Sequence, residues 1–195
     1  MNWLEPVAVA TGIISVYLSV KQKIWSWPTA LVNVALYFVV FREQRLYADM
    51  GLQVIYFVLS LYGWYEWLYG GENRTELKVS RADPRMAITL TAIAVVGVAV
   101  LGTLFARFTD ASLPYVDSAT ATTSLVAQWM MTRKVLENWA VWIAVDVVYV
   151  GMFIFKHLYL TSGLYAGFLV LAVMGHLQWR RSYRAGLAAA GAAAA

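Results

Sequence analysis

The sequence lacks cysteine altogether and contains only two histidines and four prolines among its 195 residues. The absence of cysteine excludes disulfides, thiol catalysis and cysteine-based metal sites. The histidines, His157 and His176, fall at opposite ends of one apolar segment, so they cannot share a metal ion. No glycine-rich phosphate loop and no paired nucleophile and base stand out. These absences predict a chain without a metal or a cofactor, and they argue against an enzyme.

Charged residues are also scarce. They make up 13% of the chain, and hydrophobic residues make up 61%, whereas soluble domains have roughly 25% charged and 45–50% apolar residues. The polar residues form short clusters between apolar runs of about 17 to 22 residues, close to the ~20 residues that a helix needs to cross a bilayer. The composition therefore predicts an all-α, multi-pass membrane protein.

Seven transmembrane helices are predicted, one for each apolar run. Their expected ranges are 3–20, 24–41, 46–69, 86–106, 114–132, 138–155 and 158–179. The four prolines fall at the starts of predicted helices, where a missing N–H costs no hydrogen bond. Residues 180–195 are expected to form a cytoplasmic tail whose alanine-rich end is flexible or in part not native, without a functional role.

The lysines and arginines predict the orientation in the membrane. If the N-terminus lies outside, the inner segments hold eleven of these residues and the outer segments hold four. We therefore expect the N-terminus outside and the C-terminus inside. The formal charge of +4 lies mostly in the loops, so it indicates orientation and not a nucleic-acid partner.

An internal repeat relates two parts of the chain at one constant offset, without gaps. Tryptophans, glycines and a Leu-Tyr pair all recur at this offset. The aligned positions are Trp27/Trp139, Tyr37/Tyr149, Phe41/Phe153, Leu46/Leu158, Tyr47/Tyr159, Gly51/Gly163, Gly63/Gly175 and Trp67/Trp179. The helix at 86–106 is left over and restores the direction of the second unit. The expected architecture is 3+1+3, with parallel repeats at 3–69 and 114–179 joined by that helix.

Asp146 is a single carboxylate within the apolar run 138–155. It lies seven residues beyond Trp139, or about 10 Å along a helix, near the midplane of a hydrocarbon core about 30 Å thick. Trp142, Asp146 and Tyr149 share one helical face because their spacings are four and three residues. A carboxylate at this depth costs roughly 2.5–3.5 kcal/mol on insertion scales, which favours a functional role.

Two amides, Asn33 and Gln53, reach a similar depth from two other helices, and Tyr37 shares the face of Asn33. One carboxylate, two amides and several aromatic faces predict a site for a small molecule. A flat cationic ring suits it best, through stacking and cation–π attraction.

Structural interpretations of these residues stay open. Asn33 and Gln53 could cross-link helices within the bilayer. The tryptophans near the inner interface, above all Trp25, Trp67 and Trp179, are expected in an aromatic belt. Asp146 has no basic residue at its depth to pair with, so for this residue the functional interpretation is favoured.

Three segments resemble the Pnu family of vitamin transporters. They are IWSWPTALVN, LYADMGLQVIYFVLSLYGWYEW and the long run from TRKVLENWAVW to GHLQW. The ENWxxW and LYxxxxLQ patterns are fairly specific to that family, and the resemblance covers residues 5 to 183. It implies a fold similar to SWEET proteins, a homotrimer, facilitated diffusion and trapping of the substrate by a cytosolic kinase. It also implies an inner-membrane location in bacteria.

The resemblance implies roles for individual residues. Trp139 and Trp142 match the tryptophans of the ENWxxW motif, Gln53 matches a glutamine of the family, and Asn33 falls in the matching motif of the second helix. Many family members that carry nicotinamide riboside have asparagine where this chain has Asp146. The predicted substrate-binding set is Asn33, Tyr37, Gln53, Trp139, Trp142, Asp146 and Tyr149.

The family carries nicotinamide riboside, thiamine or riboflavin. A buried carboxylate suits the first two, which are cations, and would stay unpaired beside neutral riboflavin. Nicotinamide riboside is the favoured substrate, and thiamine is the alternative. Proton-coupled transport through Asp146, a sensor or scaffold without transport, and an enzyme are the other hypotheses.

Overall fold

The computed structural model describes residues 3–43, 47–109, 113–155 and 157–194. These residues form seven α-helices and one short 3-10 turn, with a single isolated β-bridge and no named strand in the described ranges. The helices are α1 Leu4–Val20, α2 Ser26–Glu43, α3 Tyr47–Tyr69, α4 Pro84–Phe108, α5 Pro114–Thr132, α6 Asn138–Phe155 and α7 Tyr159–Ala194. The prediction of seven helices is confirmed.

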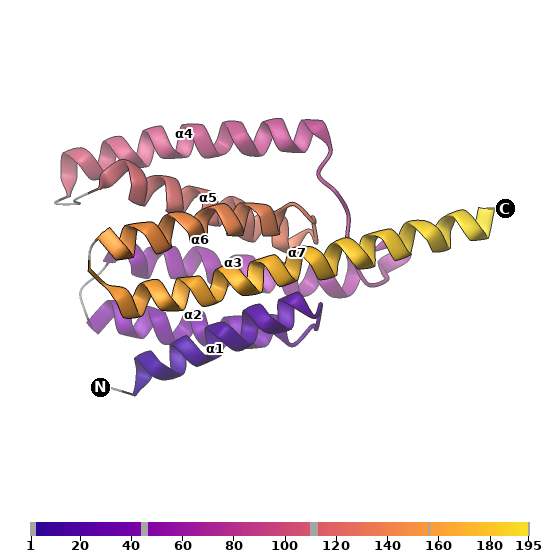
Figure 1. Ribbon diagram of the computed structural model, residues 1–195, viewed down its shortest axis with the longest axis horizontal. Helices are drawn as coiled ribbons and strands as arrows, with labels where there is room; N and C mark the ends of the chain where they lie inside the picture. The colour runs from indigo at the N-terminus through magenta and orange to yellow at the C-terminus, as the bar shows by residue number, and fades with distance from the viewer. Residues whose placement is uncertain (1–2, 44–46, 110–112, 156, 195) are drawn as a thin grey trace.

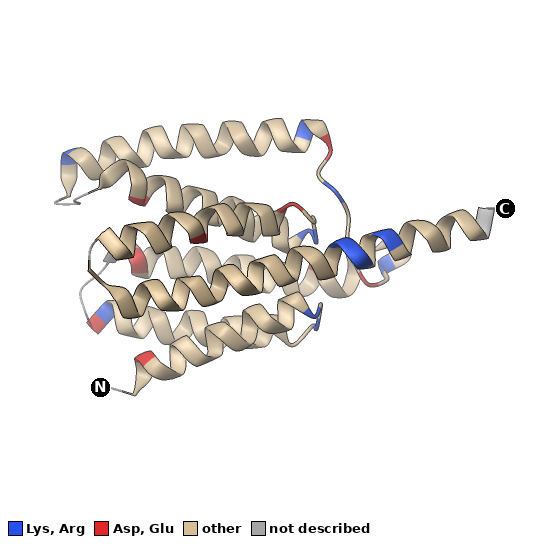
Figure 2. Ribbon diagram, in the orientation of Figure 1, with Lys and Arg blue, Asp and Glu red and all other residues tan. Residues whose placement is uncertain are grey.

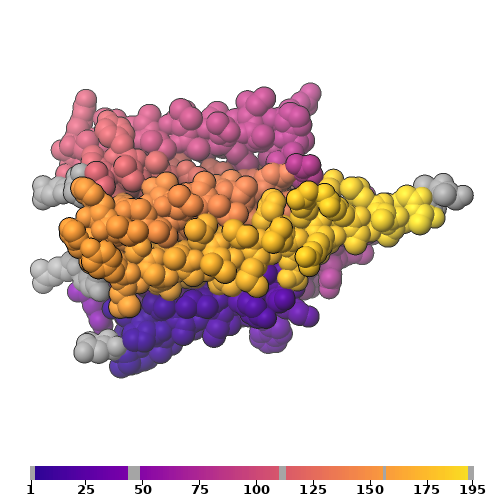
Figure 3. Space-filling model, in the orientation of Figure 1, coloured from indigo at the N-terminus to yellow at the C-terminus, as the bar shows by residue number. Residues whose placement is uncertain are grey.

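The predicted helix bounds agree with the structure to within two residues, with one exception. Helix α7 does not end at residue 179 but continues to Ala194. The alanine-rich end of the chain lengthens this helix because alanine has the highest helix propensity. In Figures 1 and 3 this end of α7 projects past the rest of the molecule.

Local sequence signals explain several helix ends. Asp83 caps α4 by accepting a hydrogen bond from the Met86 N–H at 2.7 Å, and Pro84 occupies the first turn. Helices α1 and α5 both end in a turn with a residue in the left-handed region, Gln22 (φ 54°) and Lys134 (φ 52°). These two residues are related by the offset of the sequence repeat, as are the ends of α1 and α5 and both ends of α2 and α6.

Six helices surround the centre of the bundle and α4 stands apart. Helix α4 packs against α5 and runs along the edge of the bundle in Figure 1. Close contact is possible because Gly97 lies against the Thr122 side chain and Gly102 lies against the Tyr115 ring. Helix α4 therefore contributes a packing surface, and the other six helices can form a site.

A cluster of four tryptophans closes one end of the bundle. Trp27 packs edge-on against Trp67 at 5.3 Å, Trp139 packs edge-on against Trp179 at 5.4 Å, and Trp67 contacts Trp179 at 5.8 Å. Trp67 and Trp179 are 3% and 0% exposed, so their expected place in a lipid-facing belt is wrong. Burial of four large rings against each other outweighs the preference of single tryptophans for the interface. Trp25 is exposed, as a belt residue would be.

Among the described residues, three helices are long and apolar enough to cross a bilayer by length and composition alone. They are Pro84–Phe108, Asn138–Phe155 and the segment Tyr159–Ala192. Helix α1, with 17 residues, is a shorter apolar helix. Helix α5 is less apolar because it carries buried hydroxyls, among them Ser118, Thr120 and Ser124, which face the interior of the bundle instead of lipid.

Candidate functional site

A cavity of about 420 Å³ lies between the six helices of the bundle. Helices α1, α2, α3, α5, α6 and α7 all supply lining residues, and α4 supplies none. The volume is in the range of pockets that hold small ligands. The cavity extends from the tryptophan cluster, where Trp27 and Trp139 line it, to Phe41 and Asp49 near the other ends of α2 and α3.

All seven residues of the predicted binding set line this cavity. They are Asn33 and Tyr37 on α2, Gln53 on α3, and Trp139, Trp142, Asp146 and Tyr149 on α6. Residues on one face of a helix reach the same space because the helical period brings positions three and four apart onto one side. The structure therefore brings the predicted residues together, which is a necessary condition for a shared binding role.

Asp146 is the most deeply buried charge of the cavity. The residue is 5% exposed, and its carboxylate takes part in no hydrogen bond or salt bridge within the described ranges. Among the residues that the structure describes, no lysine or arginine lines the cavity. A buried carboxylate without a protein partner is costly, so Asp146 is the residue of the cavity whose charge is least satisfied by the protein itself.

A second carboxylate, Asp49, lines the cavity near the start of α3. This residue is exposed, in contrast to Asp146. It interacts electrostatically with Asp117 at the start of α5. The end of the cavity away from the tryptophans therefore carries negative charge.

Asn33 both cross-links two helices and lines the cavity. Its amide nitrogen donates to the backbone oxygen of Ala8 at 2.6 Å and lies 3.4 Å from the Thr11 hydroxyl. Gly12 permits this contact, since a Cβ there would lie 3.1 Å from the same nitrogen. The cross-link from α2 to α1 uses the amide nitrogen of a residue that also lines the cavity.

One side of the cavity is an aromatic wall. Tyr149 lies 4.5 Å from Tyr165 between ring centroids, and Phe153 stacks on both of them at 5.8 and 5.2 Å. Phe168 adds an edge-on contact to Tyr165 at 6.0 Å. On the opposite repeat, Tyr37 stacks on Phe41 at 5.5 Å. These faces can hold a flat ring by stacking.

Several lining residues escaped the sequence interpretation. Among the polar or aromatic ones are Ser15, Ser19, Ser26, Trp27, Asp49, Tyr56, Ser60, Ser124, Gln128, Tyr165 and Phe168. Isolated serines and tyrosines on apolar helices do not stand out in a sequence. The repeat itself contains the missing signal, because it aligns Tyr165 with Gln53 and Trp27 with Trp139, and both of those partners were predicted to bind.

The site has no metal centre among the described residues, in which no group of three or more His, Cys, Asp or Glu could hold an ion. What the geometry offers is a polar and aromatic chamber inside a bundle of apolar helices. A buried central cavity in a multi-pass helical membrane protein is the arrangement of a membrane transporter for a small molecule.

The comparisons with known proteins identify the family. The chain matches the family described as "Nicotinamide mononucleotide transporter" over residues 2–181 and belongs to it. The resemblance to the Pnu transporters is thereby confirmed. The chain is a multi-pass protein of the inner membrane.

Two curated relatives have different substrates in their names. The "Nicotinamide riboside transporter PnuC" of Escherichia coli strain K12 is 29% identical over 94% of this chain and 87% of its own length. The "Riboflavin/roseoflavin transporter RibM" of Streptomyces davaonensis is also 29% identical, over 91% of this chain and 84% of its own. Both relatives are transporters and not enzymes. Overall identity does not distinguish between their substrates.

One solved structure is closely similar in fold. The "Crystal structure of the Vitamin B3 transporter PnuC" superimposes with a TM-score of 0.72 at 29% identity, over 94% of this chain and 83% of that chain. The seven-helix bundle described above is therefore the fold of a vitamin transporter.

Proposed function

We propose that this protein is a passive transporter of a cationic B-type vitamin, with nicotinamide riboside as the favoured substrate and thiamine as the alternative. The observation that carries the proposal is Asp146, a buried carboxylate that lines the cavity without a partner among the described residues. A pyridinium or thiazolium ring supplies the missing positive charge. Neutral riboflavin would leave the carboxylate unpaired.

The proposed pose assigns a chemical task to each part of the cavity. The cationic ring stacks on Trp142 and Trp139 and lies close to the Asp146 carboxylate. Tyr149 extends the aromatic surface beside it. The acceptor oxygen of Asn33, the Gln53 amide and the Tyr37 hydroxyl bind hydroxyl or amide groups of the rest of the substrate.

The proposed architecture is a 3+1+3 parallel repeat of the SWEET type. Its support is the constant offset of the sequence repeat, which recurs in helix bounds, in the left-handed residues Gln22 and Lys134, and in the ring pairs Tyr37–Phe41 and Tyr149–Phe153. Parallel repeats around a midplane cavity allow the two sides to open in turn.

The proposed orientation has the N-terminus outside and the C-terminus inside. The two termini lie at opposite ends of the bundle (Figure 1), and Lys and Arg gather at the end where α7 leaves it (Figure 2). A cysteine placed at Glu72 should then react only with membrane-permeant reagents in intact cells. One placed at Glu43 should react with impermeant reagents as well, and the reverse pattern would contradict this orientation.

Transport by facilitated diffusion, with trapping by a cytosolic kinase, and a homotrimeric assembly complete the proposal. Passive transport needs no coupled ion and fits a cavity with one deep carboxylate. Two carboxylates in one cavity, Asp146 and Asp49, are the observation that favours the second candidate, which is proton-coupled uptake.

Binding and flux measurements test these functions together. Calorimetry on the purified protein should detect nicotinamide riboside or thiamine, but not riboflavin. Proteoliposomes should then equilibrate the bound vitamin without a proton gradient and accumulate it only when a kinase and ATP are sealed inside. Tight riboflavin binding would overturn the cation assignment, and uptake that collapses with the proton gradient would favour the coupled mechanism.

A further inference from the structure

The surface at the inner end of the α1–α7 seam carries five cationic side chains that the cavity does not use. They are Lys21 and Lys23 in the loop after α1, and Arg180, Arg181 and Arg184 on α7. All five are exposed. Within the described ranges none of them forms a salt bridge, whereas Arg81 and Arg133 are paired with Glu137 and Glu66. Lys21 lies 5.8 Å from the centre of the Tyr17 ring, but it remains exposed, so all five charges are available to a partner outside the chain.

Two hydrogen bonds hold the loop after α1 against α7. The Trp179 indole donates to the backbone oxygen of Ser19 at 3.0 Å, and the Gln22 amide donates to the Ser182 hydroxyl at 2.8 Å. Lys21 and Lys23 flank Gln22, and the arginines flank Ser182. The five charges therefore belong to one structured surface, and not to a free tail.

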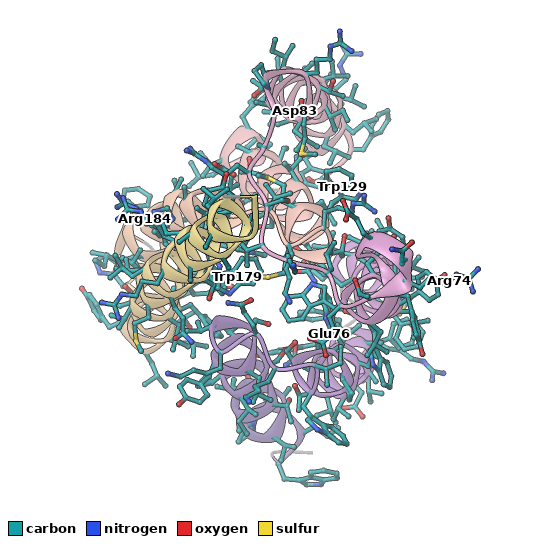
Figure 4. All side chains as sticks on the ribbon, turned by 90° about the vertical axis from the view of Figure 1, so that its right-hand side faces the viewer. Arg74, Glu76, Asp83, Trp129, Trp179 and Arg184 are labelled. Atoms are coloured by element: carbon teal, nitrogen blue, oxygen red, sulfur yellow. The ribbon has the colours of Figure 1, made fainter. Side chains whose placement is uncertain are left out.

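Helix geometry places this surface at the level of lipid headgroups. Arg180 lies 21 residues after the start of α7 at Tyr159, or about 32 Å along the axis. A hydrocarbon core is about 30 Å thick, so Arg180, Arg181 and Arg184 emerge just beyond it. Figure 4, viewed from this end, places Arg184 on the outside of the bundle and Trp179 near its centre.

The neighbouring surface is apolar. Tyr17 on α1 and Val173 and Leu177 on α7 are exposed, and they lie on the membrane side of the charges. A partner that satisfies both parts has a negatively charged head and a hydrocarbon chain. A free phosphate ion would satisfy the charges alone.

We propose that Lys21, Lys23, Arg180, Arg181 and Arg184 form a binding site for an anionic glycerophospholipid of the inner leaflet. The phosphate and its headgroup contact the arginines and lysines, and the acyl chains follow the exposed residues of α1 and α7. Basic clusters next to a membrane helix attract anionic lipids with a factor of about five in affinity for each Lys or Arg near the surface. This site does not depend on the identity of the transported vitamin.

Native mass spectrometry of the full-length protein in a neutral detergent tests the site. Phosphatidylglycerol and phosphatidylcholine with the same acyl chains are titrated separately. We expect phosphatidylglycerol to bind more tightly, and the triple variant R180Q/R181Q/R184Q to lose affinity for it by on the order of 100-fold. The variant K21Q/K23Q should lose less, because it removes two charges.

The matched control is R74Q/K78Q/R85Q, which removes three exposed cations elsewhere at the same end of the bundle. It should bind phosphatidylglycerol as the wild type does. Thermal unfolding of each variant shows that it is folded. Equal binding of the two lipids, an equal loss in the control, or displacement of the lipid by millimolar glycerol phosphate would each overturn the proposal.

Discussion

At the residue scale, the structure separates charges that are satisfied from one that is not. Glu66 and Glu137 pair with Arg133 and Arg81. Asp146 has no such partner among the described residues and lines the cavity. Protein interiors rarely tolerate an unpaired charge, and this contrast is the basis of the proposal that a cationic substrate pairs with Asp146.

Replacement of Asp146 by asparagine tests the counter-ion role. D146N keeps the shape of the side chain and removes its charge. We expect it to weaken binding of a cationic vitamin by roughly 10- to 100-fold, the effect of losing one buried charge-assisted contact of about 1.5–3 kcal/mol. Calorimetry measures the change.

The control is D49N, which removes a carboxylate from the exposed end of the same cavity. It should change the affinity much less, since water screens an exposed charge. Unchanged binding in D146N would show that Asp146 is not the counter-ion.

Two glycines at equivalent positions of the repeats allow the tryptophans to pack. A Cβ on Gly63 would lie 2.2 Å from the Trp27 ring, and a Cβ on Gly175 would lie 2.5 Å from the Trp139 ring. Both rings are buried in the tryptophan cluster and cannot move aside freely. G63A and G175A should each destabilise the protein by roughly 1–3 kcal/mol through overpacking.

The chain offers a matched control for these variants. Gly51 and Gly163 lie on the same two helices, and an added Cβ at either position would meet no other atom within 4 Å. G51A and G163A should be neutral or raise stability by up to about 1 kcal/mol, because alanine is the better helix former. Thermal unfolding in detergent measures all four, and an equal effect in both pairs would contradict the packing argument.

At the element scale, the segment between α3 and α4 is fastened to the loop between α5 and α6. Ser80 exchanges backbone hydrogen bonds with Lys134 and Leu136 at 3.1 and 2.9 Å. Glu137 accepts from the Ala82 N–H at 2.9 Å and from Arg81 at 2.8 Å. The long linker is therefore a structured strap across the end of the bundle that holds the tryptophan cluster, and an ionised Glu137 accepts two of the hydrogen bonds that attach it.

This attachment predicts a pH dependence. Partial burial raises the pKa of Glu137, but the hydrogen bonds from Ala82 and Arg81 outweigh it and hold the pKa below its ordinary value of 4.5. A group whose pKa is lower in the folded than in the unfolded state stabilises the fold when the pH is above the unfolded-state pKa. This stabilisation is lost as the pH falls through the folded-state pKa. The melting temperature of the wild type should therefore fall more steeply below pH 4.5 than that of E137Q.

Glu72 provides the comparison for this measurement. It is exposed and its side chain makes no hydrogen bond within the described ranges. The melting temperature of E72Q should change with pH as that of the wild type does between pH 6 and 3.5. If the melting temperatures of the wild type and E137Q fall in parallel with pH, Glu137 does not hold the strap.

At the scale of the whole molecule, the two sequence repeats contact each other through hydrogen bonds at equivalent positions. The Trp67 indole on the first repeat donates to Met131 of the second at 3.1 Å, and the Trp179 indole on the second donates to Ser19 of the first at 3.0 Å. The donors Trp67 and Trp179 are separated by the offset of the sequence repeat, and so are the acceptors Ser19 and Met131. Each repeat is thus held by the other at the closed end of the cavity.

This reciprocity predicts equal effects of equivalent substitutions. W67F and W179F each remove one buried donor and part of a ring, and each should lower stability by about 1–3 kcal/mol. The exposed Trp25 gives the control W25F, which should be close to neutral. Thermal unfolding compares the three, and a large effect in only one of the two buried positions would contradict a symmetric interlock.

Much of this protein follows from its sequence because the deciding interactions are local. Apolar runs of bilayer length and prolines at helix starts predicted the seven helices to within two residues at nearly every end. The helical period placed Trp142, Asp146 and Tyr149 on one face, and that face does line the cavity. Helix formation and facial alignment depend on neighbours a few residues away, which a sequence displays directly.

The tertiary structure decided what depends on distant neighbours. Trp67 and Trp179 are buried because their partners come from other helices, and no local pattern distinguishes them from the exposed Trp25. The Asn33 amide nitrogen is occupied by Ala8 on α1, a contact between residues 25 positions apart. Packing between helices determines which polar groups satisfy each other and which, like Asp146, line the cavity without a partner among the described residues.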